Sequence, residues 1–316
     1  MDRPFNSSPP DLSEWTFVKE RRTGAVYRSP DGSLYLRTGS EAAIRAEAEF
    51  AEAAWREGFP VPEVTDVGVF ATGLGYFVET SAGEEDFGRL LGREFAGAGR
   101  ISDALFEAYR GVTLRFLAAQ LKPSCRQPGP SKLREGVRLG NVLRENPDLP
   151  EDLFERAVAK AEERTRDLPL VLTHGDLTPF NVLPVGVIDF EERFVAPAGY
   201  DAITCVTFQQ FWDHPLPGGS GTMRSYNFSR TQIDDYLRGM DAACETAGAP
   251  ALSPFFDDFL TLKAIWALCY ERPSDMASAQ VTRWKWRRRV ATYCAERYLS
   301  DAPIESESFR AVGLAS

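Results

Sequence analysis

Four polar residues near the middle of the chain have the types and the spacing of a phosphoryl-transfer site. They are His174, Asp176, Asn181 and Asp189, and apolar runs lie on either side of them. A kinase catalytic loop has a histidine, an aspartate two positions later and an asparagine five positions after that, followed by a metal-binding aspartate. The four residues match this order and spacing. The pattern therefore predicts a loop that transfers a phosphoryl group.

The chemistry of such a loop explains why these residue types are needed. Phosphoryl transfer depends on an in-line nucleophile and on groups that hold negative charge. Asp176 can orient a hydroxyl and accept its proton late in the reaction. Asn181 and Asp189 offer the hard oxygen ligands that Mg²⁺ prefers, and His174 is expected to brace the loop rather than to titrate. The alternative is an ordinary polar loop, since Asp and Asn both favour turns.

Two short apolar stretches are expected to carry the loop. Residues 170–173 and 187–188 read as buried strands before His174 and before Asp189. Only seven residues separate Asn181 from Asp189, so residues 184–186 must make nearly the whole turn between them. A two- to three-residue turn is feasible, and it limits how far apart the two predicted metal ligands can lie.

The motif resembles that of the aminoglycoside phosphotransferase and choline kinase-like family. The resemblance lies in three segments, which are His-Gly-Asp-Leu at 174–177, Asn-Val-Leu at 181–183 and Gly-Val-Ile-Asp-Phe at 186–190. Residues 197–201 resemble the family's segment after the metal-binding aspartate, and the first 80 residues match more loosely. The stretch between Asn181 and Asp189 is shorter than the family usually has.

The resemblance implies a fold, an activity and a set of roles. The fold is α+β: a bilobal protein kinase-like fold with a small antiparallel-sheet N-lobe and a larger, mainly helical C-lobe. The activity is phosphorylation of small molecules. Asp176 would be the catalytic base, Asn181 and Asp189 the magnesium ligands, and Asp201 a structural support of the catalytic loop.

The beginning of the chain has the element order of a kinase N-lobe. Strands are predicted at residues 15–19, 25–28, 33–37, 66–70 and 74–79, and a helix rich in Ala and Glu from 40 to 57. We therefore expect a nucleotide-binding lobe at residues 1–82. A helical lobe with the catalytic loop and substrate site would follow at 83–316, with helices at 102–121, 152–165, 229–248, 253–272 and 277–299.

Five residues of the first lobe are candidates for binding the nucleotide. Arg37 stands where a kinase has its third-strand lysine, and Glu47 on the helix is its candidate partner. Strand alternation puts Tyr35 and Arg37 on one face of the sheet. Arginine is bulkier than lysine and no clean substitute for it, so a catalytically inactive nucleotide-binding protein is one alternative, and a surface Arg–Glu pair of almost no energetic value is another.

The other three candidates carry weaker signals. Gly24, between the first two strands, lets the backbone approach phosphates closely, although a plain hairpin turn needs a glycine equally well. Glu79 and Ser81 begin a segment whose backbone can bind an adenine ring, as a kinase hinge does; the alternative is an ordinary loop.

Composition narrows the class of protein. The chain has 316 residues, 43% of them hydrophobic and 26% charged, with a net charge of −10. The acidic balance argues against a nucleic-acid binder held by a basic field. There is no signal-peptide core and no apolar run long enough for a membrane span, and five scattered cysteines fit reduced thiols. We expect a cytoplasmic enzyme without nucleic-acid or membrane partners, and predict no particular oligomeric state.

The acceptor is expected to bind near Asp176, against the helical lobe. Residues 214–221 can form a lid or a mere linker, and Trp266 with Tyr270 can form an aromatic wall or part of the core. Several carboxylates can hold an amine or be plain surface charges, namely Glu191, Glu192, Asp213, Asp257, Asp258 and Glu271. The basic run at 283–289 fits an amphipathic helix better than a base-stacking or membrane segment.

These observations combine into one predicted function. The chain is expected to move the γ-phosphate of ATP, with GTP as an alternative nucleotide, to a hydroxyl of a small molecule with the help of Mg²⁺. By resemblance, the leading acceptors are amino sugars, including aminoglycosides, and amino alcohols. A kinase for a sugar or an amino-acid metabolite is equally compatible.

Overall fold

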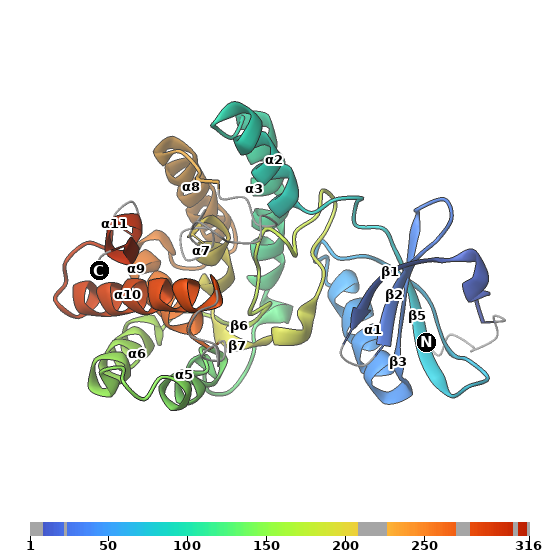
Figure 1. Cartoon of the computed structure of the whole chain (residues 1–316), viewed down its shortest axis with the longest axis horizontal. Helices are drawn as coiled ribbons and strands as arrows, with labels where there is room; N and C mark the ends of the chain where they lie inside the picture. Colours follow the sequence, from blue (N-terminus) through green and yellow to red (C-terminus); the bar gives the residue numbers. More distant parts are fainter. Residues whose placement is uncertain (1–8, 22–23, 208–225, 270–278, 306–308, 315–316) are drawn as a thin grey trace. The chain divides into compact units, whose positions relative to one another are not determined.

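The chain folds into two compact units. The computed structural model describes residues 9–21, 24–207, 226–269, 279–305 and 309–314 (Figure 1). The N-terminal unit comprises Met1–Glu85 together with Leu183–Ile188, and the C-terminal unit comprises Asp86–Val182 together with Asp189–Ser316.

The N-terminal unit is built on a five-stranded antiparallel sheet. The strands are β1 (Thr16–Arg21), β2 (Gly24–Arg28), β3 (Leu34–Ser40), β4 (Val64–Val69) and β5 (Leu74–Thr80), in the order β1-β2-β3-β5-β4. The 16-residue helix α1 (Glu41–Arg56) joins β3 to β4, and a short 3₁₀ helix, η1 (Leu12–Glu14), precedes β1. The predicted order of three strands, a helix and two strands is confirmed, as is the fold class.

Alternation along the strands gives this sheet two apolar faces. Ile44 and Ala48 of α1 pack against Val64 and Phe77 on one face, and Figure 1 shows α1 lying along the sheet. On the other face Leu36 belongs to a second buried cluster, together with Tyr76 and Val78. In the register, Arg37 pairs with Phe77, so the side chain of Arg37 points to the face that α1 covers.

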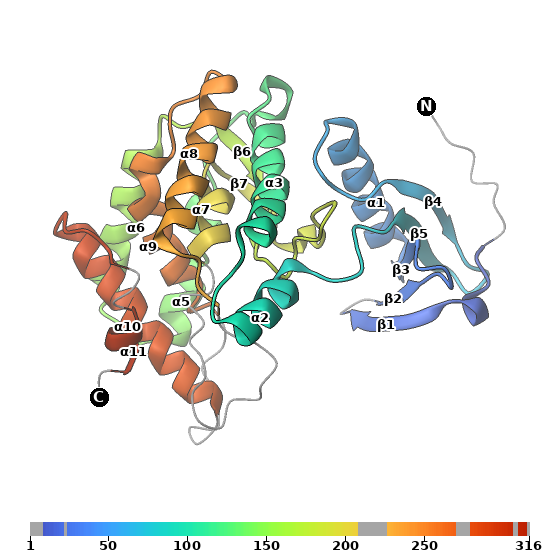
Figure 2. The same ribbon diagram turned by 90° about the horizontal axis from the view of Figure 1, so that it is seen from above.

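The C-terminal unit is mainly helical. Its first helices are α2 (Phe87–Ala98), α3 (Asp103–Gln120), α4 (Leu133–Gly136), α5 (Leu139–Glu145) and α6 (Glu151–Thr165), with the 3₁₀ helix η2 (Pro123–Cys125) after α3. Next come β6 (Leu170–Thr173), η3 (Phe190–Glu192), β7 (Phe194–Pro197) and α7 (Tyr200–Thr207). The last are α8 (Arg230–Thr246), η5 (Ser253–Phe255), α9 (Phe256–Trp266), α10 (Ala279–Leu299) and α11 (Phe309–Leu314). Figure 2 shows α3 and α8 packed side by side.

One predicted strand is wrong. Residues 187–188 form no strand in this fully described stretch, and β6 pairs with β7 instead. Leu183 and Gly186 exchange backbone hydrogen bonds of 2.8 and 3.2 Å, so Pro184 and Val185 alone make the turn. The Val187 N–H then donates to Pro60 O at 2.7 Å. A ladder cannot extend because Asp189 adopts a left-handed conformation two residues later.

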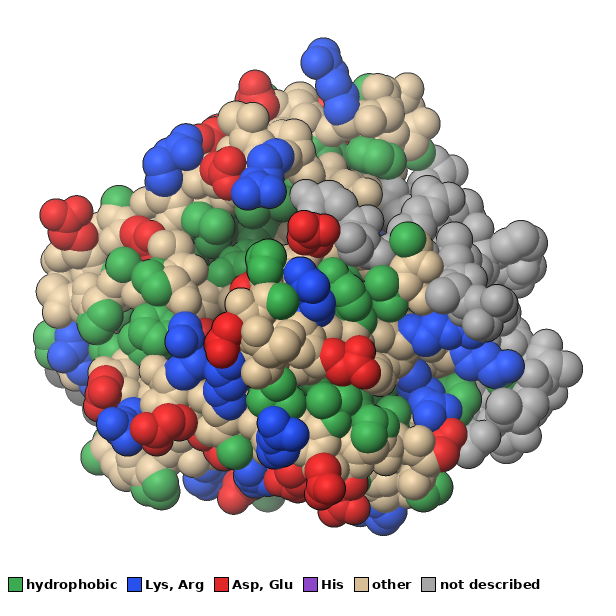
Figure 3. Space-filling view, turned by 90° about the vertical axis from the view of Figure 1, so that its left-hand side faces the viewer, with side chains coloured by type: hydrophobic (Ala, Val, Ile, Leu, Met, Phe, Trp, Pro, Cys, Tyr) green, Lys and Arg blue, Asp and Glu red, His purple; other side chains and the backbone are tan. Residues whose placement is uncertain are grey.

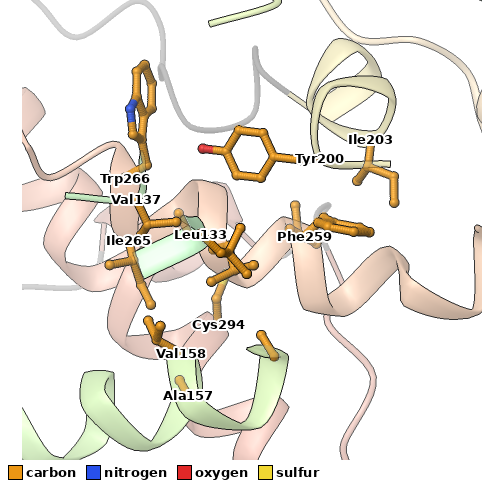
Figure 4. Packing of buried hydrophobic residues seen from close by; sticks show 14 of the residues in the cluster. Leu133, Val137, Ala157, Val158, Tyr200, Ile203, Phe259, Ile265, Trp266 and Cys294 are labelled. Carbon is orange, nitrogen blue, oxygen red and sulfur yellow. The ribbon is translucent and has the colours of Figure 1, made fainter. Parts of the chain in front are cut away.

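The core of the C-terminal unit brings together helices that are far apart in the sequence. Leu133 and Val137 near α4, Val158 of α6, Ile265 of α9 and Cys294 of α10 lie in one buried cluster (Figure 4). At the start of α8, Ser229 and Gln232 form the predicted capping box in both directions. The helix predicted to end before Pro273 ends at Trp266.

The basic run lies on α10 with its tryptophans inside. Trp284 and Trp286 are buried, and the Trp284 indole donates to Asn146 Oδ1 at 2.6 Å. Neither ring is therefore available for a base or a membrane surface. Figure 3 shows acidic and basic side chains interspersed on the face that it displays. No helix among the described residues is long and apolar enough to span a membrane.

Candidate active site

A buried carboxylate accepts hydrogen bonds from the backbone at the start of the loop after β6. Asp201, at the start of α7, is 1% exposed. Its Oδ2 accepts from the His174 backbone N–H at 2.7 Å and from Gln120 Nε2 at 2.9 Å, and its Oδ1 accepts from the Gly175 N–H at 3.1 Å. Burial raises the pKa of Asp201, while the neighbouring His174 side chain and these hydrogen-bond donors oppose the rise. This carboxylate fixes the backbone that leads to Asp176.

Gly175 can be nothing but glycine in this loop. Its φ is +82°, and a Cβ built on it would lie 2.0 Å from the carbonyl oxygen of Glu192. His174 is fully buried beside Phe190, with ring centroids 4.6 Å apart. Its Nδ1 accepts a hydrogen bond from the Asp176 N–H at 3.3 Å. The histidine thus links the strand to the backbone of the aspartate.

Asn181 closes the loop onto Asp176. Its Nδ2 donates to Asp176 O at 2.8 Å and to Asp176 Oδ2 at 3.4 Å. Both bonds use the amide nitrogen, which turns the amide oxygen of Asn181 away from Asp176. Asp176 and Asn181 are therefore brought together, as the spacing predicted.

Asp189 is held in a sparsely populated backbone conformation. Its φ of 72° and ψ of 64° are left-handed, a region that Asp tolerates better than most residues. Such strain costs of order 1 kcal/mol or more and is concentrated at functional sites. The negative charge of Asp189 is near enough to Asp176 to be one of the causes that raise the pKa of Asp176, after burial and the charge of Glu192.

Arg37 lies at the centre of a charge network within the N-terminal unit. Its Nε donates to Glu79 Oε1 at 2.6 Å, and its NH1 to Glu47 Oε1 at 3.2 Å. Arg21 donates to both oxygens of Glu47, at 3.0 and 3.2 Å. The side chain of Arg37 is 8% exposed, so the Arg37–Glu47 contact is not a surface pair.

Two of the nucleotide candidates have structural tasks. A Cβ on Gly24 would lie 1.8 Å from Thr38 O, so glycine is required for β2 to pack against β3. The Ser81 N–H donates to Ser33 O at 2.8 Å, and Ser81 Oγ accepts from the Gly83 N–H at 3.2 Å. These two backbone donors of the predicted hinge are engaged.

Comparison with known proteins decides the family. A model of the phosphotransferase enzyme family matches residues 16–240. The chain belongs to this family. Its predicted nature as a small-molecule kinase is thereby confirmed. No match is found among curated proteins.

Solved structures resemble this phosphotransferase over nearly its whole length. A Ralstonia eutropha JMP134 protein, assigned by name to the aminoglycoside phosphotransferases, is 14% identical with a TM-score of 0.57, covering 97% of this chain and 94% of its own. A thermostable mutant of aminoglycoside phosphotransferase APH(4)-Ia, in ternary complex with AMP-PNP and hygromycin B, is 17% identical with a TM-score of 0.52, covering 92% and 95%. At these identities the likeness shows the shared fold.

A buried lysine that the sequence did not point to lies beside Asp176 in this phosphotransferase. Lys263 of α9 is 1% exposed, and its Nζ lies 3.9 Å from Asp176 Oδ1. It donates to Gly175 O at 3.2 Å. Burial lowers the pKa of Lys263 to about 8, against the charges of Asp176 and Asp201 that raise it. The sequence feature that could have indicated this residue is a lysine among the apolar residues of α9.

Two residues that were candidates for binding the acceptor substrate already contact other side chains of the protein. The indole of Trp266 faces Lys263, whose Nζ is 3.3 Å from its centroid, and Asp258 is buried and accepts from Arg164 Nε at 2.8 Å and from Tyr298 OH. Neither is a free wall or an exposed charge. Glu192 forms an ion pair with Arg138. The proposed lid at 214–221 lies outside the described residues, as do Tyr270, Asp213 and Glu271.

Proposed function

We propose that this phosphotransferase moves the γ-phosphoryl group of ATP to a hydroxyl of a small molecule, with Asp176 as the catalytic base. The observation that carries the proposal is the pairing of Asp176 with Asn181 on a loop whose backbone is fixed by Asp201. A loop held so firmly suits a reaction that depends on positioning.

Asp176 offers one oxygen to the acceptor. Oδ1 is buried, and the side chain as a whole is 29% exposed. Oδ2 is therefore the oxygen that would orient the hydroxyl and take its proton as the O–P bond forms. Asn181 Nδ2 lies on this same oxygen and steadies it.

The donors of the loop fit a magnesium ion. Asn181 presents its amide oxygen and Asp189 its carboxylate, both hard oxygen ligands. Within the described ranges no group of three His, Cys, Asp or Glu side chains could hold a metal, and Mg²⁺ commonly takes its other ligands from phosphates and water. When bound, the ion would neutralise charge on the phosphates.

The nucleotide is proposed to be bound by the N-terminal unit. Arg37, oriented by Glu47 and Glu79, would contact its phosphates, with Ser81 and the neighbouring backbone near the base and Gly24 near the phosphates. The APH(4)-Ia structure, named as a complex with an ATP analogue and hygromycin B, supports ATP and an amino-sugar acceptor. Amino alcohols follow as the second acceptor class.

The proposal is tested by assaying transfer directly. Purified protein would be incubated with Mg²⁺ and γ-labelled ATP or GTP, across a panel of aminoglycosides, amino alcohols, sugars and hydroxy amino acids. The expected result is a phosphorylated amine-bearing product. Tight nucleotide binding without product from any acceptor would support an inactive nucleotide-binding protein, and absence of nucleotide binding would overturn both.

Removing the arginine should weaken nucleotide binding. Arg37→Met is expected to raise the KM for ATP about tenfold or more, because a charged hydrogen bond is worth about 1.5–3 kcal/mol. Arg37→Lys should raise the KM for ATP by a smaller factor, because lysine keeps the positive charge. It should still raise the KM, because an ammonium group cannot bind both glutamates as the guanidinium group does. Arg45→Met, which removes an exposed partner of Glu41 on α1, is the control. An unchanged KM in Arg37→Met would remove Arg37 from the phosphate site.

The proposed metal ligand predicts a specific magnesium dependence. Asp189→Asn should raise the Mg²⁺ concentration needed for half-maximal activity about 10- to 100-fold, in the range seen when groups that support a metal are lost. The measurement is an Mg²⁺ titration at saturating ATP. Asp167→Asn, which neutralises a carboxylate 94% exposed elsewhere, should match the wild type; a shift as large in this control would point to a general charge effect.

A further inference from the structure

Burying Lys263 costs free energy, and packing alone does not explain why a lysine occupies this position. A buried lysine must give up its hydration, and such residues are rarely fully buried unless paired. Lys263 is 1% exposed within α9, where its neighbours Leu262 and Ala264 are buried and apolar. A leucine or methionine would fill the same position without this penalty. The lysine therefore needs another reason to be there.

The surroundings of its ammonium group are those of a fixed charge. The group lies 3.3 Å from the ring centroid of Trp266 and 5.7 Å from that of Tyr200. Indole faces attract cations, more strongly where water is excluded. Figure 4 shows Tyr200 with its hydroxyl turned toward Trp266, and that hydroxyl is buried without a hydrogen bond among the described residues. The aromatic rings and the Gly175 carbonyl hold the ammonium beside the catalytic loop.

The ammonium of Lys263 faces an oxygen of Asp176 that no described residue hydrogen-bonds. Asp176 Oδ1 is buried, accepts no hydrogen bond from the part of the chain that the structure describes, and is 3.9 Å from Lys263 Nζ. The other oxygen is contacted by Asn181 Nδ2 at 3.4 Å. A carboxylate with one buried, unsatisfied oxygen would turn that oxygen toward solvent unless a positive charge attracted it.

We propose that Lys263 is a positioning residue for phosphoryl transfer, which holds Asp176 Oδ1 inward and so presents Oδ2 to the acceptor hydroxyl. The inference rests on the proposed role of Asp176 as the base. Lys263 does not touch the reacting atoms; it acts through the carboxylate. The hydrogen bond from Lys263 Nζ to Gly175 O holds the ammonium group next to the loop.

The competing explanation is that Lys263 only ties α9 to the loop backbone through Gly175 O. The two explanations differ in what a neutral side chain of similar size would do. A tie to the backbone stabilises the fold and affects every property of the site together. A positioning charge affects the chemical step, and only while Asp176 is there to be positioned.

A double-mutant cycle separates these explanations. Lys263→Met is expected to lower kcat about 10- to 100-fold, by analogy with the loss of a group that orients an active-site ligand, with the KM for ATP within about twofold of the wild type. In an Asp176→Asn background the same change should have almost no further effect, because residues that act through one another are not additive. An equal loss of kcat in both backgrounds, or a loss that only accompanies a lower Tm, would overturn the proposal.

A matched control exists on α6. Lys160 also lies over an aromatic ring, 4.7 Å from the centroid of Tyr298, and donates to a backbone carbonyl, Tyr298 O, at 2.7 Å. Its hydrogen-bond partners, Tyr298 O and Asp301 Oδ1, both lie outside the loop that carries Asp176. Lys160→Met should keep kcat unchanged, which shows that loss of a lysine of this kind is not itself the cause.

A crystal structure of Lys263→Met gives a readout that needs no activity. The Asp176 carboxylate is expected to rotate so that Oδ1 leaves its buried position. An Asp176 side chain in the wild-type orientation would overturn the proposal even if no acceptor were ever found. Conversely, a wild-type enzyme without transfer activity, together with a rotated Asp176 in the variant, would overturn the proposed function and not the positioning by Lys263.

A second variant tests the proposal if Lys263→Met does not fold. Trp266→Phe keeps an aromatic ring but weakens the attraction for the ammonium group, so it is expected to give a smaller loss of kcat with the same dependence on Asp176. An unaltered kcat in Trp266→Phe would overturn the proposal.

Discussion

Replacing Asp176 by asparagine is expected to lower kcat by about two to four orders of magnitude, the usual contribution of a general base. Asparagine has the same shape and can still accept the hydrogen bond from Asn181 through its amide oxygen, but it cannot take a proton from the acceptor. The measurement is phosphoryl transfer to the best acceptor of the panel at saturating ATP. Nucleotide affinity should change little, because Asp176 is on the loop and not among the nucleotide candidates.

The control for this variant is another aspartate outside the loop. Asp152 is exposed in the first turn of α6, and Asp152→Asn should leave kcat unchanged. Near-normal turnover in Asp176→Asn would remove Asp176 from the role of base. A lower apparent ATP affinity with unchanged kcat would instead assign Asp176 to binding.

Local sequence signals predicted the N-terminal unit well because local interactions determine it. Turn residues separate the strands, and α1 is rich in strong helix formers, so each element is specified by its own neighbours. The strands fall within a few residues of their predicted limits. The Arg37–Glu47 contact was also found, since the kinase frame names both positions. The contacts of Arg21 and Glu79 with this pair were not, because no spacing rule links these side chains.

The strand predicted at residues 187–188 shows where local reasoning fails. Val187 and Ile188 are apolar and β-branched, which favours a strand. A strand also needs a partner ladder, and the two-residue turn at Pro184 and Val185 leaves none long enough. The left-handed backbone of Asp189 then redirects the chain into η3. The shortness of this segment was visible in the sequence, but its consequence for the backbone was not.

Lys263 shows a second limit, which is set by distance along the chain. It contacts Gly175, 88 positions away, and no local pattern pairs a helix of the last third of the chain with the loop. A lysine within an apolar helix signals burial of a charge without naming the partner. The partner is clear only when α9 and the loop are packed in the same core.

Three carboxylates of the two units, one buried and two partly buried, have one physical feature in common. Glu47 accepts from two arginines, Asp176 faces a lysine, and Asp201 accepts from three N–H groups. Burying charges is costly, and well-packed apolar residues would often be at least as stable. Their placement beside the loop that carries Asp176 and on the face of the sheet that α1 covers is what the proposed roles of Asp176 and Arg37 in phosphoryl transfer require.

Asp201→Asn should show how far catalysis depends on the support beneath the loop. The amide has the same size as the carboxylate but only one acceptor oxygen. Of the three donors on Asp201, which are the N–H groups of His174 and Gly175 and the side-chain amide of Gln120, at least one would then face an N–H group. An unsatisfied buried donor costs about 1–3 kcal/mol, so the free energy of unfolding should fall by roughly that amount, measured by urea denaturation.

The same variant should lose activity even where it is fully folded. A misplacement of about 1 Å at a reacting group can cost about 100-fold in rate, and a freed Gly175 amide allows Asp176 that movement. Asp258→Asn is the matched control, because Asp258 is equally buried and hydrogen-bonded to Arg164 and Tyr298 but not to the loop. It should lower stability without lowering the kcat of the folded enzyme. If both variants lost kcat only in proportion to the fraction unfolded, Asp201 would be a stabilising residue like Asp258, and the geometry of the loop would have to be set by His174, Asn181 and Lys263 without it.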